Sequence, residues 1–185
     1  MTQHDHHDET DGRRLRGAHR RMQLIDATVR VIARDGVAGV THRAVAAEAG
    51  VPKSAATYHF TSLDDLLVAA LRSDTERLVA ALPSTPDGSD IGWLAEELVL
   101  FIEQHREQVV AGYELYLFAA RRPALRPAVG LWLDVVGGLI CHHTDDPVRV
   151  RACVAVIDGY TLQSLTTGVE PSATELAALL RLTLH

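Results

Sequence analysis

The segment 41–66 constrains the fold most, because it has the pattern of two short helices joined by a glycine turn and followed by a newly capped helix. Thr41 is suited to cap the first short helix, whose small residues allow close packing against a neighbour. Gly50 tolerates the left-handed backbone of a tight turn, and Pro52 suits the first turn of the next helix. This order of signals predicts a helix-turn-helix that reads DNA.

The second short helix, predicted over 53–59, has the composition of a recognition helix. It carries a cation, hydroxyls, a phenol and an imidazole, and its two central alanines are small enough to let a helix enter the major groove. The run 61–65 then places a hydroxyl three residues before an acid, which is typical of the start of a further helix.

These pieces resemble the TetR family of transcriptional regulators. The resemblance rests on the threonine-started helix at Thr41, the Ala-Gly-Val turn at 49–51, the Tyr-His-Phe junction at 58–60 and the cap at 62–64. It implies a helical second domain that dimerises and binds an effector. Two positions depart from the family pattern, since Thr57 replaces an aromatic residue and Leu63 replaces a lysine, so we expect altered base readout and one lost backbone contact. The expected DNA-binding residues are Thr41, Arg43, Pro52, Lys53, Ser54, Ala55, Ala56, Thr57, Tyr58 and His59.

The charge distribution agrees with DNA binding at one end of the chain. The net charge is −6, but residues 13–53 carry nine Lys or Arg against three acids, whereas residues 54–185 carry nine against seventeen. Phosphate neutralisation supplies much of the affinity for DNA, so a basic segment on an acidic body is the expected arrangement. A solvated basic helix face is the alternative interpretation.

The pattern along the chain predicts an all-α fold with two domains. Residues 1–12 are polar and rich in His and Asp, and we expect them to form a disordered tail. A helix from 13 to 34, ended by Gly36, completes a three-helix DNA-binding domain at 13–60. A ligand-binding and dimerisation domain is expected at 62–185, with helices at 62–82, 90–104, 107–120, 124–142, 146–168 and 172–183.

Two features of the second domain concern regulation. The helix that starts at Ser62 follows the recognition helix directly, so a tilt at its far end would reach the DNA-reading end as a rigid-body motion. The last two helices, 146–168 and 172–183, are unusually apolar, and we expect a homodimer through them in a four-helix bundle. Ordinary core packing explains the same apolar stripes.

Aromatic and polar residues of the middle helices are candidates for an effector pocket. Apolar walls with a few polar anchors describe a small-molecule site, although aromatic residues at helical spacing also serve as core. Glu114 and Asp158 stand among apolar neighbours, where an acid needs an internal partner or a ligand. The candidate residues for binding an unknown small molecule are Trp93, Phe101, Tyr113, Glu114, Tyr116, Trp132, Asp158 and Gln163.

Several other function classes find little support in the sequence. It has no nucleophile-elbow, phosphate-loop or zinc-protease motif, so we expect no enzyme, no cofactor and no metal. The run 142–146 contains metal-compatible side chains, but a solvated turn is favoured. Cys141 and Cys153 are expected to be buried free thiols. No apolar run approaches the roughly 20 residues of a membrane span, and cytoplasmic residence is expected.

The sequence therefore predicts a sequence-specific regulator that binds a double-stranded DNA operator, with repression relieved by a small-molecule effector. Activation remains an alternative, because nothing in the reader encodes its position relative to a promoter. A helical ligand-binding or protein-interaction module without DNA binding is the alternative from another class, and a helical enzyme is the third.

Overall fold

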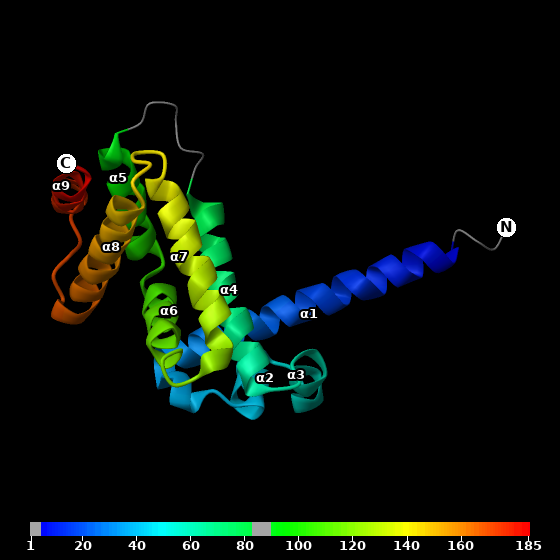
Figure 1. Cartoon of the computed structure of the whole chain (residues 1–185). Helices are drawn as coiled ribbons and strands as arrows, with labels where there is room; N and C mark the ends of the chain where they lie inside the picture. The colour runs from blue at the N-terminus through cyan, green and yellow to red at the C-terminus, as the bar shows by residue number, and fades with distance from the viewer. Residues whose placement is uncertain (1–4, 83–89) are drawn as a thin grey trace.

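The computed structural model describes residues 5–82 and 90–185, and within these ranges all regular elements are helices (Figure 1). This confirms the all-α prediction. The elements are α1 (Asp5–Asp35), η1 (Val37–Gly39), α2 (His42–Glu48), α3 (Lys53–His59), α4 (Leu63–Ala81), α5 (Ile91–Gln104), α6 (Arg106–Phe118), η2 (Pro123–Leu125), α7 (Arg126–Ile140), α8 (Pro147–Thr167) and α9 (Ala173–Leu184).

Local sequence signals set the helix-turn-helix as expected. The Thr41 hydroxyl accepts a hydrogen bond from the Ala44 amide at 3.0 Å and caps α2. Gly50 has a φ of 65° in the turn before α3, a conformation that residues with a Cβ adopt only with strain. A full capping box opens α4, because the Asp65 amide donates to the Ser62 hydroxyl and the Asp65 carboxylate accepts from the Ser62 amide.

Helix α1 differs from its predicted extent. It begins at Asp5, so residues 5–12, which we expected to be disordered, are helical, while residues 1–4 lie outside the described residues. The helix extends well beyond the body of the protein (Figure 1) and ends, as predicted, before Gly36, whose φ is 72°.

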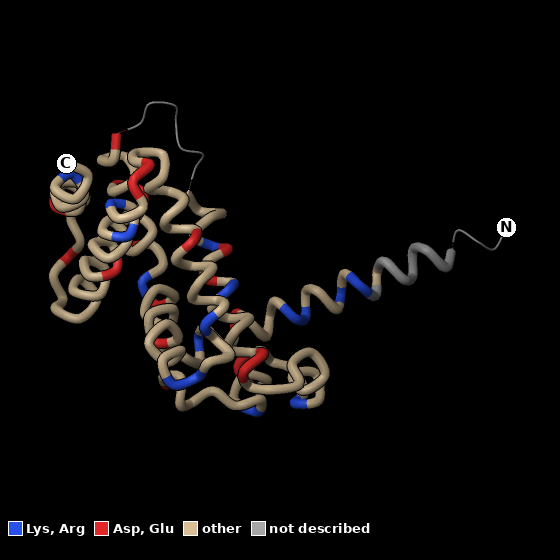
Figure 2. The backbone as a smooth tube through the Cα atoms, in the orientation of Figure 1, with Lys and Arg blue, Asp and Glu red and all other residues tan. Residues whose placement is uncertain are grey.

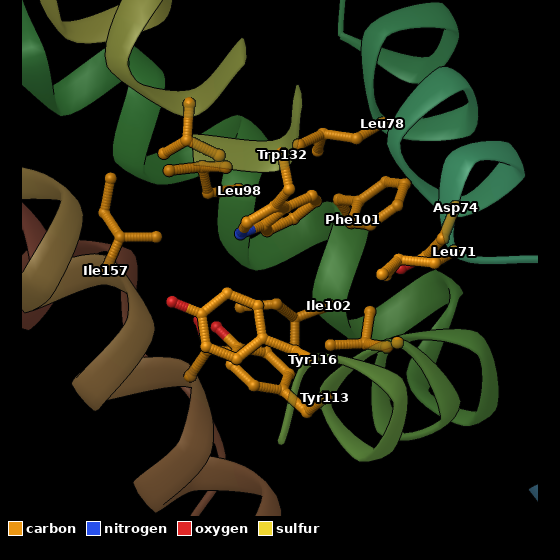
Figure 3. A pocket seen from close by; sticks show the side chains of 14 residues that line it. Leu71, Asp74, Leu78, Leu98, Phe101, Ile102, Tyr113, Tyr116, Trp132 and Ile157 are labelled. Carbon is orange, nitrogen blue, oxygen red and sulfur yellow. The ribbon is translucent and has the colours of Figure 1, made fainter. Parts of the chain in front are cut away.

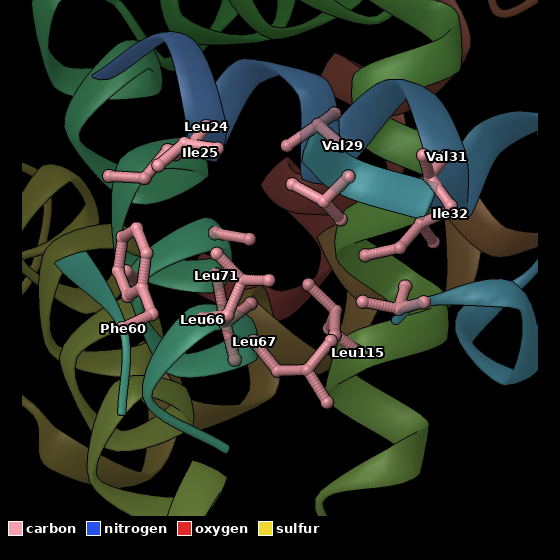
Figure 4. Close-up of a cluster of buried hydrophobic side chains, with 14 of the residues drawn as sticks. Leu24, Ile25, Val29, Val31, Ile32, Phe60, Leu66, Leu67, Leu71 and Leu115 are labelled. Atoms are coloured by element: carbon pink, nitrogen blue, oxygen red, sulfur yellow. The ribbon is translucent and has the colours of Figure 1, made fainter. Parts of the chain in front are cut away.

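A single apolar cluster joins the DNA-binding helices to the second domain. Leu24 and Ile32 of α1, Phe60 after α3, and Leu66 of α4 are all at most 2% exposed, and Leu115 of α6 packs with them (Figure 4). Helices α4 and α6 therefore belong to the core of the helix-turn-helix as well as to the domain beyond it. A displacement of either helix has to move the DNA-reading end, because close-packed cores transmit strain.

A second apolar cluster fills the far end of the molecule. It contains Leu78 at the end of α4, Leu94 and Leu98 of α5, and Leu176 and Leu180 of α9. Helix α9 packs against α5 and α8, so part of the apolar surface predicted for a subunit interface is used inside the chain. Other apolar residues of α8 and α9 stay exposed, among them Val148 at 73% and Leu182 at 78%.

Two expectations about apolar segments and cysteines need revision. The stretch Pro123–Ile140 is long and apolar enough to cross a membrane by composition, with a mean hydropathy of 1.3 over 18 residues, but it contains α7, which packs against α4 and α8 as a domain helix.

Cys153 is a buried free thiol as predicted, whereas Cys141 is exposed. The helix ends at Ile140, so Cys141 lies at its solvent-facing end.

Candidate DNA interface and effector cavity

The candidate DNA-binding residues form a polar surface on α2 and α3, which we call the recognition surface and define as Thr41, Arg43, Pro52, Lys53, Ser54, Thr57 and Tyr58. All seven are exposed, and the Tyr58 side chain reaches 82%. Figure 2 shows the basic positions of α2 and α3 together on the lower edge of the molecule. A short helix with an exposed cation, hydroxyls and a phenol has the groups needed to contact phosphates and base edges.

Three predicted contact residues lie differently. Ala56 is fully buried in the core, so its assignment as a DNA-binding residue is wrong: its methyl group packs the recognition helix onto the domain. Ala55 and His59 are half-buried at the margin of the surface. The Thr57 hydroxyl donates back to the Ser54 carbonyl at 3.2 Å, so it is partly engaged within its own helix.

Buttressing contacts of this surface escaped the sequence analysis. Arg30 and Arg34 of α1 donate to the Glu48 carboxylate of α2 at 2.7 and 2.8 Å, and the hydrogen bond from Arg30, together with that from Arg34, lowers the pKa of Glu48. His42 Nε2 lies 3.0 Å from the Phe60 carbonyl and ties α2 to the end of α3. Two of the nine cations in the basic segment therefore support the motif, since they are paired with an acid.

Helices α4 to α8 enclose a cavity in the second domain, a candidate ligand site that we call the effector cavity. Its free volume is about 40 Å³, and Asp74 lies beside Phe101 and Leu71 on one wall, with Trp132 and two tyrosines on the others (Figure 3). The full lining is Leu71, Asp74, Leu78, Leu98, Phe101, Ile102, Val109, Gly112, Tyr113, Tyr116, Trp132, Val136, Ile157 and Thr161.

Asp74 is the charged group of this cavity. Asp74 is only 8% exposed, and its Oδ1 atom has no hydrogen-bond partner among the described residues. Burial raises the pKa of its carboxyl from 3.8 to about 7, and nearby Arg77 acts in the opposite direction. A buried, unpartnered carboxyl group is energetically costly, which is a signature of a site that recognises a ligand.

Asp158 supports the cavity wall from behind. The Tyr113 hydroxyl donates to Asp158 Oδ1 at 3.0 Å. Burial raises the pKa of Asp158, and hydrogen bonds from Tyr113 and Trp132 partly offset this rise. Asp158 is not a lining residue, but it fixes the orientation of two aromatic side chains that are.

The structure divides the eight predicted pocket residues. Phe101, Tyr113, Tyr116 and Trp132 line the cavity, and Asp158 lies behind it. Three residues do not line the cavity: Trp93 packs in the second apolar cluster, Gln163 is exposed, and Glu114 lies at the contact between α6 and the end of α1. Asp134 of α7, another acid of the middle helices, is exposed.

Asp74 is not among the residues predicted from the sequence, although its spacing indicates burial. Asp74 lies three residues after Leu71 and four before Leu78, and both leucines are buried. This spacing places it on the buried stripe of α4. It stands within a polar run, Arg72 to Arg77, which has the composition of a solvated face.

The fold and the two sites define a DNA-binding regulator with a ligand cavity. Residues 24–70 match the family model for bacterial regulatory proteins of the tetR family, and residues 89–185 match that for a tetracyclin repressor-like C-terminal domain. The chain belongs to the TetR family, and it is a ligand-responsive, DNA-binding transcriptional regulator. Family members are cytoplasmic proteins.

Named relatives include a nicotine-responsive repressor and a second transcriptional regulator. The nicotine-responsive transcriptional repressor HdnoR of Paenarthrobacter nicotinovorans is 36% identical over 115 residues, which is 60% of this chain and 59% of that protein's length. The regulator BetI of Rhizobium meliloti (strain 1021) is 43% identical over 159 residues, which cover 79% of this chain and 78% of BetI.

Solved structures of similar proteins extend over most of the chain. The multidrug binding protein EbrR, solved in complex with ethidium, is 46% identical with a TM-score of 0.77 and covers 89% of this chain and 98% of its own. A TetR-family member from Streptomyces coelicolor A3 is also 46% identical, with a TM-score of 0.80, and covers 89% of this chain and 97% of its own.

Proposed function

We propose that the protein is a homodimeric repressor whose effector is an aromatic cation, bound in the effector cavity with its positive charge at Asp74. The observation that supports this most strongly is the unpartnered carboxyl group of Asp74 inside an otherwise apolar cavity. A cationic ligand pairs with the carboxylate and offsets its burial, whereas a neutral ligand leaves that carboxyl group without a charged partner.

The aromatic walls favour the same class of ligand. Phe101, Tyr113, Tyr116 and Trp132 present ring faces and edges to the cavity, and such rings attract cations through their quadrupoles and stack on planar ligands (Figure 3). Structures of EbrR with ethidium, proflavin and malachite green show what that relative binds, at 45–46% identity to this chain. These three dyes are therefore the first ligands to test.

Ligand uptake has to enlarge the cavity. Its free volume of about 40 Å³ is far below the roughly 300–1,000 Å³ of typical small-molecule sites. The walls that must move include α4 and α6, and both helices also pack against the DNA-binding helices. Opening the cavity then changes the position of the two recognition helices, which need a spacing of about 34–36 Å for successive major grooves.

The proposed dimer uses the surface of α8 and α9 that the chain leaves uncovered. Its exposed apolar residues are Val148, Leu162, Leu179 and Leu182. The two helices pack against each other, and their copies in a second subunit would complete a four-helix bundle and cover these side chains. The recognition surface of each subunit would contact one half of a near-palindromic operator.

Direct binding of ethidium tests the effector class. Titration of the dimer with ethidium, followed by dye fluorescence, is expected to show saturable binding that weakens at least about tenfold in Asp74→Asn, since the ion pair is lost. The matched control is Asp134→Asn, which removes the same charge from an exposed site on α7 and should leave the affinity unchanged. Equal affinity of the wild type and Asp74→Asn would refute the assigned role of Asp74.

A further inference from the structure

Glu114 of α6 makes a long-range contact with the DNA-binding domain. Its Oε2 atom accepts a hydrogen bond from the Val37 amide at 3.0 Å, between residues 77 positions apart. Val37 is the first residue of η1, and an N–H group at a helix start has no partner within its own helix. The Glu114 carboxylate satisfies this donor, and hydrogen bonds to ionised groups are stronger than neutral ones.

The backbone at this contact is shaped for the carboxylate. Gly36, directly before Val37, has a φ of 72°, and a Cβ built on it would lie 3.5 Å from Glu114 Oε2. The chain therefore turns sharply at the end of α1 and presents the Val37 N–H to α6. In the described part of the chain no cation forms an ion pair with Glu114, so the Val37 amide is its one recorded polar partner.

The same turn of α6 borders the effector cavity. Gly112, Tyr113 and Tyr116 line the cavity, and Glu114 follows Tyr113 directly. Successive residues of a helix point about 100° apart, so Glu114 leaves the helix on a different side from its neighbour Tyr113. One rigid helix turn thus carries a cavity wall on one side and the contact with the end of α1 on another.

From this arrangement we infer that Glu114 is a positioning residue that holds the helix-turn-helix in its operator-binding orientation and releases it when the cavity opens. The inference rests on the proposed function, in which a ligand enlarges the cavity. Ligand entry displaces Tyr113 and Tyr116, and α6 moves with them. A shift of about 1 Å is sufficient to break the bond to Val37, because hydrogen bonds weaken steeply beyond roughly 3.2 Å.

The test is whether a variant of Glu114 changes the affinities for operator and for ethidium in opposite directions, because the two binding equilibria are reciprocally linked. Glu114→Ala is expected to weaken binding to a duplex from the DNA flanking its own gene by about three- to tenfold without ligand, and to tighten ethidium binding to the free protein. Glu114→Gln keeps a carbonyl acceptor and should restore most of the wild-type behaviour. Glu107→Ala, which removes an exposed acid from the same helix, is the matched control and should change neither affinity.

A merely structural role predicts a different result. A folded Glu114→Ala that binds operator and ethidium more weakly together and has a lower melting temperature would overturn the inference, and so would an unchanged operator affinity. If Glu114→Ala does not fold, hydrogen exchange of the Val37 amide in the wild type decides, since the inference requires faster exchange when ethidium is bound. If the wild type binds no ethidium, the proposed effector class is wrong, and the operator titrations of the two Glu114 variants decide on the role of Glu114.

Discussion

Gly112 of α6 packs directly against the carboxyl group of Asp74 of α4, so closely that a Cβ on Gly112 would lie 2.2 Å from Asp74 Oδ2. No side chain fits between these two helices without moving the buried acid. The contact therefore sets how closely α4 and α6 approach at the cavity, and these are the two helices that also belong to the core of the helix-turn-helix.

Substitution of Gly112 by alanine is expected to destabilise the protein by about 1–3 kcal/mol, because the added methyl group overpacks a buried site. The matched control is Gly130→Ala on α7, where a Cβ would have no neighbour within 4 Å and the gain in helix propensity is stabilising. Chemical denaturation measures both changes. Equal stability of Gly112→Ala and the wild type would contradict the close contact.

The buried carboxyl of Asp74 predicts a pH-dependent stability. Its pKa is raised from 3.8 to about 7, so the folded state holds the proton more tightly than the unfolded state. The contribution of the protonated Asp74 carboxyl to the free energy of unfolding is fully present below pH 3.8 and is lost as the pH rises through 7. Asp74→Asn should therefore gain stability relative to the wild type over this range, by up to about 4 kcal/mol at roughly 1.4 kcal/mol per pKa unit.

Urea denaturation at pH 5 and at pH 8 is the measurement for this prediction. Asp134→Asn is the reference variant, because it makes the same substitution at an exposed position of α7. A difference between Asp74→Asn and the wild type that is the same at the two pH values would show that Asp74 is not a buried, uncompensated acid.

Two cations of the basic segment should differ in their effect on DNA binding. Lys53 is exposed at the start of α3, whereas Arg34 is held by Asp35 and Glu48. Lys53→Ala should weaken operator binding and reduce the slope of log K against log salt by about 1, the value for one lost phosphate contact. Arg34→Ala should leave the slope unchanged. Anisotropy titrations at several salt concentrations test both variants, and identical slopes in all three proteins would place Lys53 away from the phosphates.

The proposed subunit interface depends on exposed apolar residues near the C-terminus. Leu182 is 78% exposed on α9, and Leu182→Glu should shift the protein from dimer to monomer, because it buries a charge at the proposed four-helix contact. Val79→Glu introduces the same charge at an exposed position of α4 and should leave the dimer intact. Sedimentation velocity distinguishes the two species, and a stable Leu182→Glu dimer would place the interface elsewhere.

Helix caps and turns that depend only on neighbouring residues could be predicted from the sequence. The Thr41 cap, the Gly50 turn and the cap at Ser62 each depend on residues within a few positions, so the helix-turn-helix could be predicted with its recognition helix at 53–59. Burial of Ala56 was missed, because the face that a short helix turns inward depends on its neighbours.

The polar group of the cavity and that of the contact between α6 and the end of α1 were harder to predict, because their roles arise from contacts between distant segments. Asp74 packs against Gly112, which lies 38 positions further along the chain, and Glu114 accepts a hydrogen bond from the amide of Val37. Glu114 was correctly singled out as an acid in need of a partner, but a single sequence does not specify whether that partner is a ligand or a backbone amide.

Release of the operator by a dye tests the central claim most directly. A labelled duplex from the DNA flanking its own gene, bound by the wild type, is titrated with malachite green in a mobility-shift assay, and the same titration is performed with Asp74→Asn. Any effect of the dye on the DNA alone is common to both. We expect release of the wild type at dye concentrations at least about tenfold lower than those needed for Asp74→Asn. Release of both proteins at the same concentration, or no release of either, would contradict this claim.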